Sequence, residues 1–242
     1  STGLMRQALA QALHHTGQRE AFGKRLAAQP LMRNVLADLA LEVEAATAVM
    51  LRLAEAFDHA RDDEGERAFA RIATAVGKYW VCKRAPSMIY EAMECLGGAG
   101  YVEESILPRL YREAPVNAIW EGSGNVMCLD VLRAMVREPD STTALLSELR
   151  RATGADTRLD AAIDALEAEL RRPDDIEARA RRIVETLATL LQASLLVRRA
   201  PAPVAEAFLA GRVLEPSQTF GTLPTHLPFD ALLDRAQPVE SD

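Results

Sequence analysis

The chain has 242 residues, a formal net charge of −7 at pH 7, and 49% apolar but only 5% aromatic residues, which favours a core of aliphatic helices. The acidic balance argues against broad, non-specific binding to nucleic acid, because such binding depends on cationic side chains that neutralise phosphates. No apolar run is long enough to span a bilayer, and the three cysteines and four histidines lack disulfide or metal-ligand spacing, so we expect a cytoplasmic protein with no membrane segment and no metal.

Long helices dominate the first half of the sequence. A first helix is predicted over about residues 4–16, which are rich in Ala, Leu and Gln. Pro30 suits the first turn of a second helix. Its apolar residues then recur in alternating steps of four and three, which is the pattern of a long bundle helix. That stripe consists of Met32, Leu36, Leu39, Val43, Ala46, Met50, Leu53 and Phe57.

A charged turn at residues 61–66 separates this helix from a third, predicted over about residues 67–96. Pro86 is expected to kink the third helix, because proline removes one hydrogen bond and clashes with the preceding turn. Gly97 and Gly98 are expected to end it. A loop containing Pro108 and Pro115 follows, and a fourth helix is predicted to begin near Asn125.

Four long helices with short joints predict an all-α antiparallel four-helix bundle over residues 1–138. Two further amphipathic helices are predicted near residues 159–170 and 176–197, then a short helix over 204–211. The proline-rich tail from Leu214 onward is expected to be an extended wrap. We find no strand pattern, and expect residues 139–242 to form a helical C-terminal extension packed on the bundle.

The motif Ile119-Trp120-Glu121-Gly122-Ser123-Gly124-Asn125 places one carboxylate between an aromatic residue and a turn of small residues. Burial beside an indole disfavours the charged form of a carboxyl group. A carboxylate in such a place suits a general base that works near neutral pH. The alternative interpretation is a structural acid that caps the following helix.

Three motifs together resemble the acyl-CoA dehydrogenase family. They are Arg19-Glu20-Ala21-Phe22-Gly23-Lys24 with Gln29, then Leu96-Gly97-Gly98-Ala99-Gly100-Tyr101, then Ile119-Trp120-Glu121-Gly122-Ser123. The sequence from Glu103 to Arg133 resembles the AidB branch of this family, whose members are flavoproteins of the bacterial adaptive response to DNA alkylation. The resemblance is strong from about Arg19 to Arg133 and faint beyond Glu138. It implies that the chain is a C-terminal portion, lacking the N-terminal helical and β-domains of the family.

The resemblance also implies roles for particular residues. Glu121 matches the base that removes the α-proton of the acyl thioester while the β-hydride passes to FAD. The other matching positions contact the cofactor: Arg19, Phe22 and Gln29 the FAD of a neighbouring subunit, Gly97 and Gly98 its adenine end, and Gly122, Ser123 and Asn125 its diphosphate and ribose. Two positions depart from the common pattern: Glu94 replaces a usual glutamine and Trp120 a usual tyrosine.

On this resemblance the parent protein is expected to be an FAD-dependent oxidoreductase for an acyl-CoA substrate, a dimer or tetramer through the bundle, with the chain alone inactive. One alternative is a flavoprotein whose association with duplex DNA matters more than turnover. The other is a mainly structural oligomerisation domain. Arginine pairs at residues 150–151, 171–172, 179–182 and 198–199 are able to hold phosphates, although solvated helix faces explain them equally well.

Overall fold

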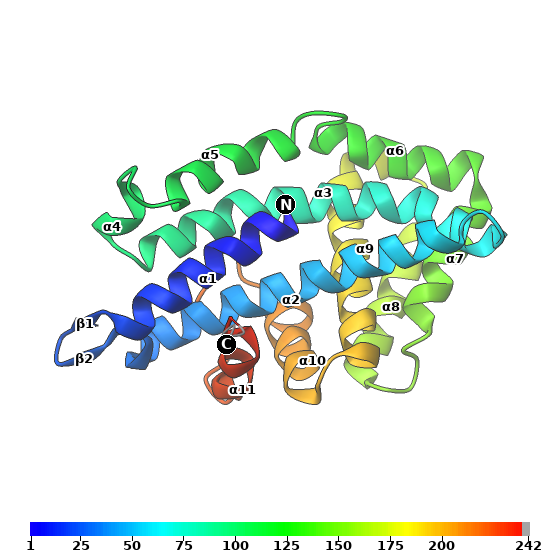
Figure 1. Cartoon of the computed structure of the whole chain (residues 1–242). Helices are drawn as coiled ribbons and strands as arrows, with labels where there is room; N and C mark the ends of the chain where they lie inside the picture. Colours follow the sequence, from blue (N-terminus) through cyan, green and yellow to red (C-terminus); the bar gives the residue numbers. More distant parts are fainter. Residues whose placement is uncertain (239–242) are drawn as a thin grey trace.

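Three long helices, α1 (Thr2–Gln18), α2 (Pro30–His59) and α3 (Glu64–Glu94), form the body of the computed structural model, which describes residues 1–238 (Figure 1). They pack against one another along their length. The start of α3 follows from its sequence. The Asp63 carboxylate accepts a hydrogen bond from the Glu66 N–H group at 3.0 Å, and acidic residues in the first turn complement the helix dipole.

The second helix is buried on more sides than one stripe predicts. Its core residues include Leu39 and Val43 from the predicted stripe, but also Leu41 and Ala45 from another face. The reason is that α1 and α3 pack on one side of α2, while helices from the C-terminal half pack on another. Met50 and Phe57, by contrast, are 46% and 60% exposed, so the outer end of the stripe is uncovered in the single chain.

Two helices, α5 (Leu107–Asn117) and α6 (Gly124–Arg137), lie along α3 at the upper edge of the molecule (Figure 1). The one-turn helix α4 (Gly98–Tyr101) precedes them. The loop predicted around Pro108 and Pro115 is therefore wrong. Pro108 lies in the first turn of α5, where the missing N–H group has no intrahelical partner to lose, and Pro115 lies near its end.

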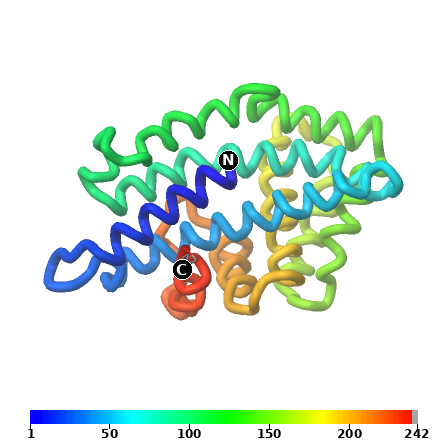
Figure 2. Tube along the Cα trace, in the orientation of Figure 1, coloured from blue at the N-terminus to red at the C-terminus, as the bar shows by residue number. Residues whose placement is uncertain are grey.

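The C-terminal half is also helical: α7 (Pro139–Arg150), α8 (Thr157–Leu170), α9 (Ile176–Arg199), α10 (Ala202–Phe208), a π-helical segment (Leu209–Leu214) and α11 (Phe229–Ala236). The sequence patterns missed α7 and α11. Helix α9 packs against α2, α3, α6, α7 and α8, so the extension shares the core of the first half. The red C-terminal segment lies against the blue α2 in Figure 2.

A short hairpin interrupts the helices after α1. Strands β1 (Glu20–Ala21) and β2 (Lys24–Arg25) pair antiparallel, with Ala21 opposite Lys24. Phe22 and Gly23 form the turn with φ angles of 54° and 83°, as a tight two-residue hairpin turn requires. The expectation of no strand is wrong for these four residues, which are too few to produce an alternating pattern.

The all-α class is thus confirmed, whereas the four-helix bundle stays a prediction. Within residues 1–238, no helix is both long and apolar enough to cross a bilayer. Among the same residues, no group of three or more His, Cys, Asp or Glu side chains is arranged to hold a metal ion.

Candidate functional site

The turn between α5 and α6 presents Glu121 in an unusual backbone conformation. Glu121 has a φ angle of 52° and Gly122 one of 113°, and a non-glycine residue in the left-handed region is held there by its surroundings. Lys78 supplies the restraint. Its Nζ atom donates to the Trp120 carbonyl at 2.8 Å and to the Gly122 carbonyl, so one ammonium group braces both sides of Glu121.

Sequence reasoning missed Lys78. The available signal was its position in a stretch of small and apolar residues, after Val76 and Gly77 and before Tyr79. The structure shows that these three neighbours are buried. A lysine inside such a stretch of helix must direct its ammonium group to a specific partner or to solvent.

Glu121 itself is exposed, and Trp120 is 57% exposed. The expected burial of the carboxylate beside the indole is therefore absent from this chain alone. The cap interpretation finds no support among the described residues, because Ser123 is the N-cap of α6 and no side-chain cap hydrogen bond is formed there. The structure thus leaves an accessible carboxylate beside an exposed aromatic surface.

The N-terminus of α6 lies directly after this turn. Ser123, Gly124 and Asn125 present backbone N–H groups at the start of a 14-residue helix, an arrangement that favours a bound anion. Glycine is favoured at position 122 by its φ angle of 113°, a backbone conformation that other residues rarely adopt. The Asn125 side chain is held from the extension, because its Oδ1 atom accepts a hydrogen bond from Nε of Arg181 at 2.8 Å.

A second group of predicted residues surrounds the hairpin. Arg19 follows α1 directly, Phe22 is 94% exposed at the tip, and Nε2 of Gln29 donates to the Ala21 carbonyl at 3.2 Å. The fold therefore brings Arg19, Phe22 and Gln29 together. All three lie away from Glu121, because the hairpin is at one end of the molecule and the Glu121 turn is midway along the upper edge (Figure 1).

The glycine turn at Gly97 and Gly98 begins α4, toward the same end as the hairpin (Figure 1). Gly97 has a φ angle of 59°, which favours glycine. An open cavity of about 600 Å³ beside this turn was not predicted. It is lined by Tyr90, Met93, Tyr101, Val102, Glu103, Glu104, Pro108, Tyr111 and Arg112.

The residues predicted from the sequence are chemically compatible with parts of a dinucleotide cofactor. The exposed Arg19 guanidinium and the N-terminus of α6 supply donors for phosphate oxygens, and Gly97 and Gly122 permit close approach of the backbone. The exposure of Trp120 and Glu121 shows that this chain does not enclose a ring system at the carboxylate. The described residues therefore do not form a complete pocket around Glu121.

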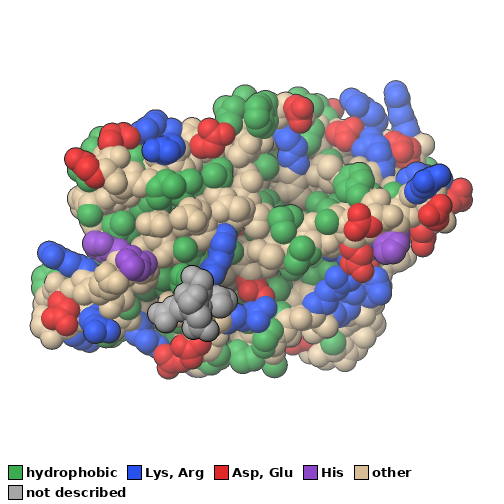
Figure 3. All heavy atoms as spheres, in the orientation of Figure 1, with side chains coloured by type: hydrophobic (Ala, Val, Ile, Leu, Met, Phe, Trp, Pro, Cys, Tyr) green, Lys and Arg blue, Asp and Glu red, His purple; other side chains and the backbone are tan. Residues whose placement is uncertain are grey.

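The arginine pairs of the extension are largely neutralised by carboxylates. Arg150 pairs with Asp164 and Glu167, and Arg198 pairs with Glu148. Glu169 alone pairs with three arginines, namely Arg172, Arg179 and Arg182. Figure 3 shows blue and red side chains beside one another at several places on the face in view. These contacts favour the interpretation of solvated helix faces.

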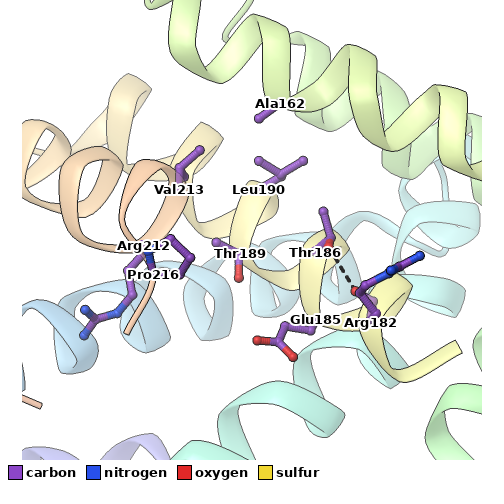
Figure 4. A pocket seen from close by; sticks show the side chains of 9 residues that line it. All are labelled: Ala162, Arg182, Glu185, Thr186, Thr189, Leu190, Arg212, Val213 and Pro216. Carbon is purple, nitrogen blue, oxygen red and sulfur yellow. Dashed lines mark hydrogen bonds between the residues drawn. The ribbon is translucent and has the colours of Figure 1, made fainter. Parts of the chain in front are cut away.

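A further cavity, of about 310 Å³, lies between α8, α9 and the segment Leu209–Leu214 (Figure 4). The Thr186 hydroxyl donates to the Arg182 carbonyl at 2.9 Å, and the Arg212 guanidinium points away from the cavity. Arg212 pairs instead with Asp38 and Glu42 of α2. Thr186 and Arg212 are thus engaged with other parts of the chain and not with the cavity.

Comparisons with known proteins identify relatives over most of the chain. Residues 1–136 match the family model described as acyl-CoA dehydrogenase, C-terminal domain. The putative acyl-CoA dehydrogenase AidB of Escherichia coli K12 is 44% identical over 208 residues, which cover 86% of this chain and 38% of that protein. The crystal structure of Caenorhabditis elegans ACDH-11 in complex with C11-CoA matches with a TM-score of 0.80 at 25% identity, over 90% of this chain and 42% of that one.

An acyl-CoA dehydrogenase from Bacillus anthracis, crystallised with FAD, shares the fold at 18% identity with a TM-score of 0.63, over 86% of this chain and 43% of that one. The chain therefore spans about two fifths of the length of these relatives. The family model ends at residue 136, close to the predicted limit of strong resemblance, whereas the 208-residue alignment with AidB continues beyond Glu138 into the extension.

Proposed function

The chain belongs to the acyl-CoA dehydrogenase family as its C-terminal domain, and on this premise we propose that it is part of an FAD-dependent oxidoreductase that dehydrogenates the α,β bond of an acyl-CoA thioester. Glu121 is the proposed base. The observation that carries this assignment is the conformation of the turn. The Glu121 backbone is in the left-handed region, its carboxylate is exposed, and Lys78 donates to the carbonyls of the residues on both sides.

In this proposal the Glu121 carboxylate accepts the α-proton of the thioester. When bound, FAD supplies the acceptor for the hydride that leaves the β-carbon. Gly122, Ser123 and Asn125 hold phosphate and ribose groups at the start of α6, while Gly97 and Gly98 admit the adenine end. The relative crystallised with C11-CoA supports an acyl-CoA substrate, and the one crystallised with FAD supports the cofactor.

The separation of Arg19, Phe22 and Gln29 from Glu121 supports a shared site between subunits (Figure 1). We propose that the hairpin residues contact the FAD of a neighbouring copy, so that the protein works as a dimer or tetramer.

We also propose two structural parts, residues 1–138 and 139–242, because the family match ends at residue 136 and α7 begins at Pro139. The unpaired Cys82, Cys95 and Cys128 agree with a cytoplasmic location.

The proposal is tested with the full-length parent protein, an acyl-CoA substrate and an artificial electron acceptor. Mass spectrometry is expected to show loss of two hydrogens from the acyl chain. Glu121→Gln is expected to lower the rate by about 10²- to 10⁴-fold, the usual contribution of a general base. Glu113→Gln, which alters an exposed acid on α5, is the matched control. Equal rates for wild type and Glu121→Gln would exclude Glu121 as the base.

A further inference from the structure

Arg181 behaves differently from its neighbours in the extension. The adjacent Arg179 and Arg182 both pair with Glu169 of α8. Arg181 instead reaches across to the first turn of α6, where its Nε atom donates to Oδ1 of Asn125 at 2.8 Å. This contact joins residues 56 positions apart in sequence, and it links the extension to the loop that follows Glu121.

The chemistry of the pair fixes the orientation of the Asn125 amide. A guanidinium group only donates hydrogen bonds, so the atom that faces Arg181 must be the carbonyl oxygen. The NH₂ group of Asn125 therefore points to the other side, where it is free to donate. Without Arg181 the amide has no such preference, since its oxygen and nitrogen ends are nearly equal in shape.

The position of Arg181 is set by a well-anchored helix. Its neighbours Ala180, Ile183 and Val184 are buried, and α9 packs against α2, α3 and α6. Arg181 and Asn125 line an open cavity of about 210 Å³ between α6 and α9, together with Cys128 and Glu177. The extension thus delivers a cationic donor to a loop that Lys78 also holds.

Resting on the proposed function, we propose that Arg181 is a positioning residue for the cofactor loop, contributed by the C-terminal extension. It holds the Asn125 amide with the NH₂ group toward the ligand, and it adds positive charge beside the N-terminus of α6, where phosphate groups are expected. Arg181 lies outside residues 1–136, which match the family model, so this role belongs to the extension and not to the matched domain.

The first test uses hydrogen exchange in the full-length parent protein without added flavin. Arg181→Gln is expected to raise the exchange rate at residues 127–130, the first hydrogen-bonded amides of α6, by roughly tenfold, because a hydrogen bond to a charged group is lost. Exchange in the middle of α9 and the melting temperature are expected to stay unchanged. Arg182→Gln, which breaks an ion pair on the adjacent residue, is the matched control. Equal exchange at residues 127–130 in Arg181→Gln and wild type would overturn the positioning role.

The second test is a double-mutant cycle on FAD binding, measured by flavin fluorescence in the same protein. Arg181→Gln and Asn125→Ala are each expected to weaken binding by about tenfold, and the double variant by no more than either, because both act through one contact. Arg181→Lys is expected to restore part of the affinity. Fully additive losses, or none, would overturn the inference. If the wild type binds no flavin, the proposed function fails instead, and hydrogen exchange still decides the role of Arg181.

Discussion

Single residues decide how the Glu121 turn is presented. Lys78 donates to carbonyls on both sides of Glu121, and Gly122 has a φ angle of 113°, which favours glycine. Of the candidate site, the motif located Glu121 and the small residues after it. It could not reveal Lys78, which comes from another helix and is more than forty positions earlier in sequence. Such a contact exists only after α3 and the turn have packed.

Lys78→Met is expected to release the turn while leaving the helices intact. In the full-length protein we predict a fall in kcat of roughly 10- to 100-fold with little change in KM, because misplacement of the base slows chemistry more than binding. Steady-state kinetics measure both constants. Arg67→Met removes an exposed cation from the same helix and serves as the control. A change confined to KM would contradict the role given to Lys78.

Glu148 is expected to make the stability of the chain depend on acid pH. Burial by itself would raise the pKa of this carboxyl, but the hydrogen bonds and charges of Arg52 and Arg198 outweigh burial and lower the pKa to about 2. The native state therefore binds fewer protons than the unfolded chain between about pH 4.5 and 2. The free energy of unfolding should decrease as pH falls through that window, by about 3 kcal/mol from this group.

Urea unfolding of the 242-residue chain at several pH values measures this effect. Glu148→Gln is expected to be less stable than wild type at pH 7, since Arg52 is 2% exposed and loses a partner. Its stability should also vary less between pH 4.5 and 2.5. Parallel pH profiles for the two proteins would show that Glu148 is not the group responsible.

At the level of elements, the long helices and the short α10 were predictable, whereas the hairpin, α7 and α11 were not. The four-three spacing predicted α2 and α9 because each has several turns facing a core. The hairpin and α11 were missed, since elements of two to eight residues carry too few apolar positions to define a period. They form because neighbouring elements cover them: Leu232 and Leu233 of α11 are buried beside α2.

The tail before α11 is fastened to α2 by buried side chains, one of which is Asn34. Nδ2 of Asn34 donates to the Leu223 carbonyl at 2.8 Å, and Oδ1 of Asn34 accepts from the Leu223 N–H group at 3.0 Å. Asn34→Leu is expected to lower the free energy of unfolding by about 2–4 kcal/mol, because two buried backbone groups lose their partners. Hydrogen exchange should increase at residues 217–236. Gln7→Leu, on the exposed side of α1, is the control, and unchanged exchange in the tail would contradict this account.

At the scale of the whole molecule, an apolar surface at one end of α2 remains exposed to solvent. Met50 and Phe57 continue the predicted stripe of α2, yet no described residue buries them. We expect a second copy of the protein to cover this end of α2, so light scattering of the full-length protein should give a dimer or tetramer at micromolar concentration. Phe57→Glu is expected to weaken assembly, whereas Leu214→Glu, at another exposed site, should not. A monomeric wild type would contradict the expectation.

The central claim is that Glu121 is the base of a flavin-dependent dehydrogenation, and a single-turnover experiment tests it most directly. The full-length protein is loaded with FAD and mixed with an acyl-CoA thioester without oxygen while its visible absorption is recorded. We predict that the wild type loses its flavin colour, and that Glu121→Gln binds the same amount of flavin and keeps its colour. Loss of colour in Glu121→Gln at the rate of the wild type would contradict the claim.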